Sequence, residues 1–176
     1  MAGMSESRHI PVMPSEVIHW LSPQPGQIIV DGTVGGGGHA RLLAEKVLPD
    51  GLIIGLDQDP AAVERCRKAC TGLPVHIIHA NFRDLPEILA ERDIQCVDGV
   101  LLDLGMSSDQ LADSSRGFSF HADGPLDLRF DPSRGEPAWA LLKHMSERTL
   151  ADLIYRYGEE RFSRRIAAAI VRERRG

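Results

Sequence analysis

Cysteines and aromatic residues are scarce in this chain, and long apolar runs are missing. Three cysteines in 176 residues are too few for a disulfide framework, so we expect reduced, mostly buried thiols at Cys66, Cys70 and Cys96. Cys66 and Cys70 are four residues apart, but a metal site would need further ligands nearby. We therefore predict no metal site and no disulfide-stabilised fold.

The lack of apolar runs bears on location. No apolar segment is long enough to span a membrane. Residues 1–7 contain no apolar signal region, so export is not expected. With 43% hydrophobic residues, the chain is able to bury one good core. These features predict a cytoplasmic protein without a membrane partner.

Glycine, by contrast, is concentrated behind an apolar run. Residues 28–30 are apolar and are followed by Asp31-Gly-Thr-Val-Gly-Gly-Gly-Gly-His39. Glycine tolerates positive φ and has no Cβ, so such a turn lets the backbone approach a ligand closely. Leu42, Leu43 and Val47 then recur at helical spacing. This order of strand, glycine turn and helix is typical of the nucleotide-cofactor half of a doubly wound α/β domain.

The details of the turn favour one class of cofactor. A dinucleotide fingerprint needs G-x-G-x-x-G and faces a pyrophosphate, whereas this turn begins with Asp31 and has Thr33 where methyltransferases usually have a glycine. A carboxylate would repel a pyrophosphate, but it suits the ammonium group of S-adenosylmethionine (AdoMet), which has no phosphate. A dinucleotide-dependent oxidoreductase is therefore disfavoured. For the glycines alone, a flexible loop that binds nothing is the alternative.

A second acid ends the next apolar segment. Residues 51–57 predict a buried strand, and Asp57 lies about 20 residues beyond the glycines, where a carboxylate can accept both hydroxyls of an adenosine ribose. Asp57 could instead cap the following helix. However, Asp59 already fits that role, with Pro60 at the first helical position. We interpret Asp57 as a ribose ligand.

Two further segments, residues 75–79 and 96–103, predict two more strands. Phe82 follows the first of them and would either lie against an adenine or simply pack in the core. Asp103 ends the second. Ligands bind at the carboxyl edge of open parallel sheets. We expect that edge to carry four of the side chains named so far: Asp31, Asp57, Phe82 and Asp103.

Residues from about 110 onward do not continue the strand pattern. Residues 116–131 are rich in Gly, Pro and Asp and predict an ordered, functional loop. Ser146 could cap a helix that ends at Gly158 and has four larger side chains on one side: Leu150, Leu153, Ile154 and Tyr157. We therefore predict a cofactor-binding domain at residues 1–109 and a loop with a helical appendage at residues 110–176.

Positive charge is concentrated at the end of the chain. The formal net charge is −5, but residues 161–176 contain six arginines against Glu173 alone. On a helix, one face would hold Phe162, Ile166, Ala169 and Ile170, and another would hold Arg161, Arg164, Arg165, Arg172 and Arg175. Such a basic face can follow a phosphate backbone. A solvated face that balances an acidic body is the alternative.

Five long motifs form a single pattern. They are His9-Ile-Pro-Val-Met13 with Glu16, the glycine turn from Asp31 to His39, Asp103-Leu-Gly-Met-Ser-Ser108 with Gln110, Arg116-Gly-Phe-Ser-Phe120 through Asp127, and Tyr157-Gly-Glu-Glu-Arg-Phe162. Together they resemble the bacterial RsmH (MraW) family, whose members use AdoMet to methylate N4 of a cytidine in the decoding centre of 16S ribosomal RNA. Minor departures from the family pattern fall at Asp109, Leu128, Phe130 and His144.

The resemblance implies a class I, Rossmann-like methyltransferase sheet with an inserted helical domain. It assigns AdoMet contacts to Gly37, Gly38, His39, Asp57, Phe82, Asp103 and Gln110. A branched side chain at Gly37 would then fill the space of the methionine moiety. Asp103 is also our catalytic candidate, because it would organise the edge at which the cytidine amine meets the methyl group.

The resemblance also implies partners and a missing part. The small ribosomal subunit and its 16S RNA are the implied partners, and DNA is not expected. Family members continue well past Gly176, so we expect a C-terminally truncated chain without the later strands of the sheet. A non-catalytic AdoMet- or RNA-binding fragment is therefore the alternative function.

Overall fold

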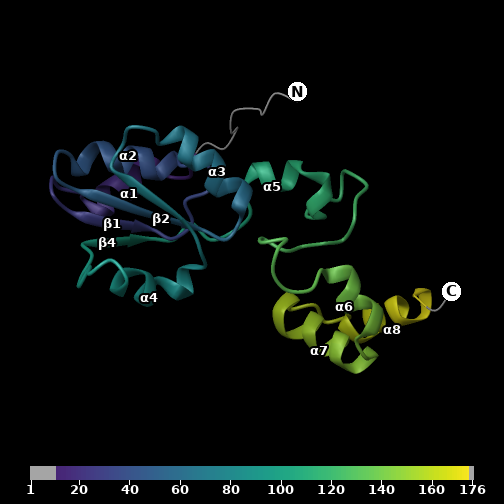
Figure 1. Cartoon of the computed structure of the whole chain (residues 1–176). Coiled ribbons are helices and arrows are strands. Elements are labelled where there is room, and N and C mark those ends of the chain that lie inside the picture. Colours follow the sequence, from purple (N-terminus) through teal and green to yellow (C-terminus); the bar gives the residue numbers. More distant parts are fainter. Residues whose placement is uncertain (1–10, 175–176) are drawn as a thin grey trace. The chain divides into compact units, whose positions relative to one another are not determined.

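The computed structural model describes residues 11–174, which form two compact units (Figure 1). The first unit ends at Ala112 and the second begins at Asp113. Throughout residues 11–174, no helix is both long and apolar enough to cross a membrane. The functions that we assigned to the two parts remain predictions.

The first unit is built on a four-stranded parallel sheet. Its strands, in the order β3-β2-β1-β4, are β1 (Ile28–Asp31), β2 (Leu52–Asp57), β3 (Val75–His79) and β4 (Gly99–Leu101). On the two neighbours of β1, Asp31 lies opposite Gly55 and opposite Leu101. All strands run parallel, so their carboxyl ends meet at one edge. The predicted α/β class with a Rossmann-like parallel sheet is confirmed.

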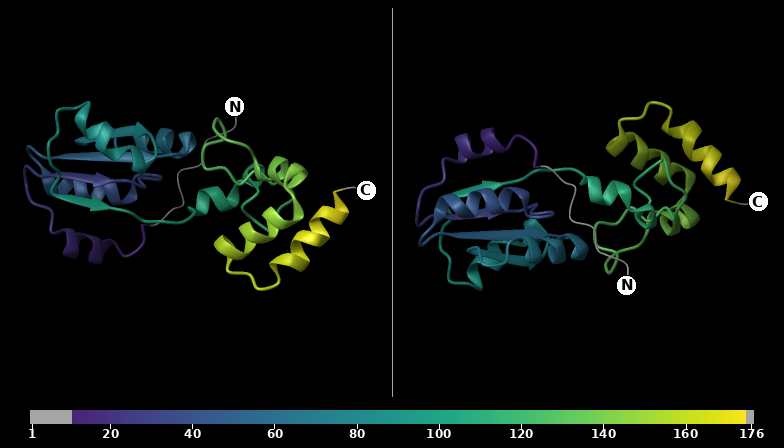
Figure 2. Two further views of the ribbon diagram at one scale, coloured as in Figure 1. Left: turned by 90° about the horizontal axis from the view of Figure 1, so that it is seen from below. Right: turned by 90° about the horizontal axis from the view of Figure 1, so that it is seen from above.

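Helices cover both faces of this sheet (Figures 1 and 2). One face packs against α1 (Pro14–Leu21), α2 (Gly38–Val47) and α3 (Pro60–Ala69), and the other packs against α4 (Leu85–Ala90). Side chains alternate along the strands, so Ile29 and Ile53 enter the first core while Val30 and Ile54 enter the second. Burial on both faces explains why these strands are continuous apolar runs in the sequence.

Two expectations about the first unit are wrong in part. β4 has only three residues, Gly99–Leu101, so Asp103 lies in the loop that follows the strand. Cys66 and Cys70 are buried as expected, but Cys96 is exposed. Pairing with β1 begins at Gly99, opposite Ile29, so Cys96 lies before the strand and outside the sheet.

The second unit is helical. After the short 3-10 turn η2 (Ser114–Arg116) and a loop, it contains α6 (Ala138–His144), α7 (Glu147–Gly158) and α8 (Ser163–Glu173). As predicted, Ser146 caps α7, because its Oγ accepts the N–H of Thr149 at 3.1 Å, and α7 ends at Gly158. The small core consists of Leu150, Ala151 and Ala167, with Leu142, Ile154 and Ile170 packed against them.

The helices bury a different face from the one that their large apolar residues suggest. On α8 the buried side chains are the small ones, Ser163, Ala167 and Val171, whereas Phe162 and Ile166 are exposed. Small residues let α7 and α8 approach closely, and the helix separation follows from the side chains at the contact. The apolar face predicted for α8 is therefore wrong for Phe162 and Ile166.

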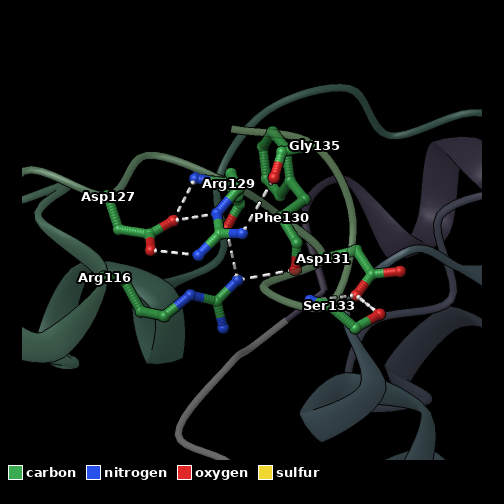
Figure 3. Close-up of polar contacts among 7 residues, drawn as sticks. All are labelled: Arg116, Asp127, Arg129, Phe130, Asp131, Ser133 and Gly135. Atoms are coloured by element: carbon green, nitrogen blue, oxygen red, sulfur yellow. Dashed lines mark hydrogen bonds and ion pairs between the residues drawn. The ribbon is translucent and has the colours of Figure 1, made fainter. Parts of the chain in front are cut away.

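Two guanidinium groups hold the loop before α6 (Figure 3). Arg116 is buried, and its Nη2 donates to the carbonyls of Arg129 and Phe130 at 2.8 and 2.6 Å. Arg129 forms two hydrogen bonds with the carboxylate of Asp127, from Nε to Oδ1 at 2.8 Å and from Nη2 to Oδ2 at 2.6 Å. This pairing holds the pKa of Asp127 below its ordinary value. The loop thus has a polar, hydrogen-bonded centre.

We expect Arg116→Met to loosen this loop and to lower the free energy of unfolding by about 1–3 kcal/mol, because two carbonyls lose a charged donor. Hydrogen exchange of the amides in residues 117–137 is the measurement, and it should become faster. Arg134→Met is the matched control, since the Arg134 side chain is 71% exposed and removal of its charge should change little. Equal exchange rates in both variants would contradict the structural role of Arg116.

Candidate cofactor-binding site

Three carboxylates converge at the carboxyl edge of the sheet. Asp31 and Asp57 are the last residues of the adjacent strands β1 and β2, and Asp103 follows β4 on the other side of β1. The structure therefore brings together the three acids that the sequence placed at this edge. In the described part of the chain, however, no group of three or more His, Cys, Asp or Glu side chains is arranged to hold a metal ion.

Asp31 differs from the other two acids because its carboxylate is almost fully buried. It is 1% exposed. Oδ1 accepts the N–H of Thr33 at 3.2 Å, whereas Oδ2 has no hydrogen-bond partner among residues 11–174. Burial raises the pKa of Asp31 to about 7, and the charges of Asp57 and Asp103 add to this effect. A buried carboxylate oxygen without a donor is unfavourable, and a cationic ligand would supply that donor.

The glycine turn between β1 and α2 is tied to β2. The N–H of Val34 donates to the carbonyl of Leu56 at 2.9 Å, and the N–H of Gly35 donates to Oδ2 of Asp57 at 2.9 Å. Oδ1 of Asp57 accepts the N–H of Asp59 at 2.8 Å. Burial nevertheless raises the pKa of Asp57. Each of its oxygens has a second lone pair, so the carboxylate can still accept hydrogen bonds from a ligand.

The end of the glycine turn begins α2. Gly37 is the residue before the helix and has a φ of +88°, and Gly38 is the first helical residue. A Cβ on Gly37 would lie 2.9 Å from Sγ of Cys66 and 3.0 Å from Sγ of Cys70. This glycine is therefore required by the packing of α2 against α3. The first amides of α2 have no partner inside the helix, and the positive end of the helix favours an anion.

Three of the predicted contact residues have partners within the protein. His39 is buried, and its Nε2 donates to the carbonyl of Val12 at 2.8 Å. Phe82 packs, half-buried, against the core beneath α4. Gln110 is buried and its Nε2 donates to Oδ2 of Asp59 at 3.0 Å, which joins α5 (Ser108–Ala112) to the start of α3. A ligand role for these three side chains stays a prediction.

Thr33 makes a positioning contact that we did not predict. Its Oγ1 accepts the N–H of Asp103 at 2.7 Å, while its own N–H donates to Oδ1 of Asp31. One residue thus joins the loops after β1 and β4, and it holds the carboxylate of Asp31 and the backbone of Asp103. The sequence did contain a signal, since threonine stands where methyltransferases usually have a glycine.

A protein-family model matches this chain. It describes the MraW methylase family and matches residues 6–176. The chain belongs to this family. The resemblance that the five motifs suggested is therefore confirmed.

Curated relatives within the MraW methylase family are similar along nearly the whole chain. The "Ribosomal RNA small subunit methyltransferase H" of Syntrophotalea carbinolica is 52% identical over 169 residues, which are 95% of this chain and 54% of that protein. The protein of the same name in Deinococcus radiodurans is 48% identical over 167 residues, which are 94% of this chain and 52% of that protein. The chain thus spans about half the length of the curated relatives that it matches.

Proposed function

We propose that this chain is the AdoMet-binding part of an enzyme that methylates N4 of a cytidine in the decoding centre of 16S ribosomal RNA. The observation that carries the proposal is Oδ2 of Asp31, in a member of the MraW methylase family: it is buried beside a glycine turn and has no hydrogen-bond partner among residues 11–174. Relatives named as small-subunit ribosomal RNA methyltransferases support ribosomal RNA of the small subunit as the substrate. Such a substrate implies a small-subunit partner and a cytoplasmic location.

The charges at the sheet edge fit AdoMet. Asp31 would accept a hydrogen bond from the ammonium group, and the N-terminal amides of α2, at Gly38 and His39, would face the carboxylate of the same amino-acid moiety. Asp57 would accept the ribose hydroxyls with its remaining lone pairs. Phe82 would lie beside the adenine, and Gln110 would close the pocket from α5.

Bound AdoMet supplies a methyl group on a sulfonium centre. The exocyclic amine of cytosine is a poor nucleophile because its lone pair is delocalised into the ring. The protein must therefore hold the amine in line with the methyl group and accept a hydrogen bond from it as charge develops. Asp103 is our candidate for that acceptor. Thr33 would hold its backbone in place in the loop after β4.

Asp57→Ala tests the cofactor assignment. We expect AdoMet to bind about 1.5–3 kcal/mol more weakly, because hydrogen bonds to a charged group are lost. Isothermal calorimetry with the 176-residue chain measures the dissociation constant. Asp50→Ala is the matched control, since Asp50 is exposed and lies at the amino end of β2. A dissociation constant within about twofold of the control would remove Asp57 from the site.

Two other functions predict different ligands and a different activity for the chain. A dinucleotide-dependent oxidoreductase would bind NADH tightly and would not bind AdoMet. A non-catalytic fragment would bind RNA or small-subunit particles without methyl transfer, even with saturating AdoMet. Methyl transfer to 16S RNA, measured in parallel with a full-length relative, separates the second alternative from our proposal.

A further inference from the structure

A basic and aromatic surface runs along α8, within the second unit. We call it the α8 patch and define it by five exposed residues: Arg161, Phe162, Arg165, Ile166 and Arg172. Phe162 is 46% exposed and Ile166 is 38% exposed. The α7–α8 core uses other residues of this helix, so the packing of the unit does not account for these two.

Two cations lie close to the ring of Phe162. Cζ of Arg161 is 4.7 Å from the ring centroid, and Cζ of Arg165 is 5.6 Å from it. The prediction that Phe162 lies opposite the arginines is therefore wrong, and the correction is informative. Cation–π contacts order long arginine side chains beside the ring before any ligand arrives. Less conformational entropy is then lost on binding.

Two acidic residues near the patch contact α8 itself. The carboxylate of Glu160 accepts the N–H of Phe162 at 2.7 Å, so it is turned toward the start of α8. Arg172 contacts its neighbour Glu173 at 3.2 Å, but both side chains are largely exposed and such pairs are weak. Arg161 and Arg165 are thus available to an anionic partner.

We propose that the α8 patch is a binding surface for unpaired RNA, in which a base stacks on Phe162 and phosphates contact Arg161, Arg165 and Arg172. RNA-binding proteins recognise unpaired bases by stacking them on aromatic rings and guanidinium planes. A planar ring beside two planar cations matches that ligand better than it matches an acidic peptide, which has charge but no large flat surface. The inference rests on the proposed function, since it names where the RNA substrate is held.

The test measures binding of a fluorescein-labelled RNA hairpin with an unpaired loop to the 176-residue chain, by anisotropy over a range of KCl concentrations. Phe162→Leu keeps the apolar volume but not the aromatic ring, and should weaken binding at least about fivefold. Phe162→Trp keeps a stacking surface and should bind as the unchanged chain does. Arg161→Gln with Arg165→Gln should reduce the slope of log affinity against log salt by about 1.4.

Lys143→Gln with Arg148→Gln is the matched control, because it removes the same charge from exposed positions outside the α8 patch. Equal loss in the two double variants, or unchanged binding by Phe162→Leu, would overturn the inference. So would displacement of the RNA by polyglutamate at equal charge concentration. Calorimetry with AdoMet is run on the same samples. If the unchanged chain does not bind AdoMet, the proposed function is contradicted, whereas the RNA result still stands.

Discussion

Replacing Gly37 with alanine is expected to lower the free energy of unfolding by about 2–5 kcal/mol. The left-handed conformation at φ +88° costs a residue with a Cβ about 1–2 kcal/mol. The new Cβ would also lie 2.9 Å from the buried Sγ of Cys66, and overpacking of this kind costs about 1–3 kcal/mol. Urea denaturation followed by circular dichroism measures the sum, and Gly37→Val should be worse than alanine.

Gly72 is the matched control for this prediction. It also has a positive φ, +81°, but nothing lies within 4 Å of the Cβ position. Gly72→Ala should therefore show only the conformational cost, about 1–2 kcal/mol. Adding Cys66→Ala to Gly37→Ala removes the clashing sulfur and should recover part of the difference between the two sites. Equal destabilisation at Gly37 and Gly72 would show that the contact with the thiols is unimportant.

This prediction differs from the one that the sequence alone suggested for Gly37. The glycine turn itself was predictable, because four consecutive glycines after a strand have few other uses. The direction in which a Cβ on Gly37 would point was not predictable. It depends on Cys66 of α3, which packs beneath the turn only because β1 and β2 are neighbours in the sheet. A side chain expected to fill the ligand space would instead press into the core.

The rest of the chain also has features that the sequence predicts and features that only the structure shows. Caps such as Asp59 and Ser146 were predictable, because a helix cap is a contact between residues two or three positions apart. The buried face of α8 was not, since it is selected by packing against Leu150, Ala151 and Ile154 of α7. The site shows both cases. Strand ends located its acids, whereas the Thr33 contact with Asp103 spans 70 residues and appears only in three dimensions.

Asp31→Asn is expected to stabilise the protein without ligand at pH 8 while removing most of its AdoMet affinity. The pKa of Asp31 is raised to about 7 in the folded chain, whereas an aspartic acid in an unfolded chain has a pKa of about 3.9. A raised pKa means that the protonated form is favoured by folding. The stability from Asp31 is therefore complete below about pH 4 and is lost as the pH rises through about 7.

The size of this effect follows from the shift. About three pKa units correspond to about 4 kcal/mol as an upper limit, so we expect the asparagine variant to be about 2–4 kcal/mol more stable than the unchanged chain at pH 8. Near pH 4 the two should unfold alike. Asp50→Asn removes an exposed carboxylate and should alter neither curve. Urea titrations at several pH values give the comparison, and a constant difference across pH would contradict the assignment.

Cofactor binding should favour the ionised form of Asp31, whereas folding favours the protonated form. Only the ionised Asp31 attracts the ammonium of AdoMet, so affinity should fall as the pH drops below about 7. It should fall again above about pH 8, where an α-amino group loses its proton. Asp31→Asn should bind AdoMet at least about tenfold more weakly, the effect of losing roughly 1.4 kcal/mol, and the acidic limb of its pH profile should flatten. A variant with full affinity and an unchanged acidic limb would mean that another group holds the ammonium. With the expected result, the destabilising buried charge of Asp31 is accounted for by the ligand that it attracts.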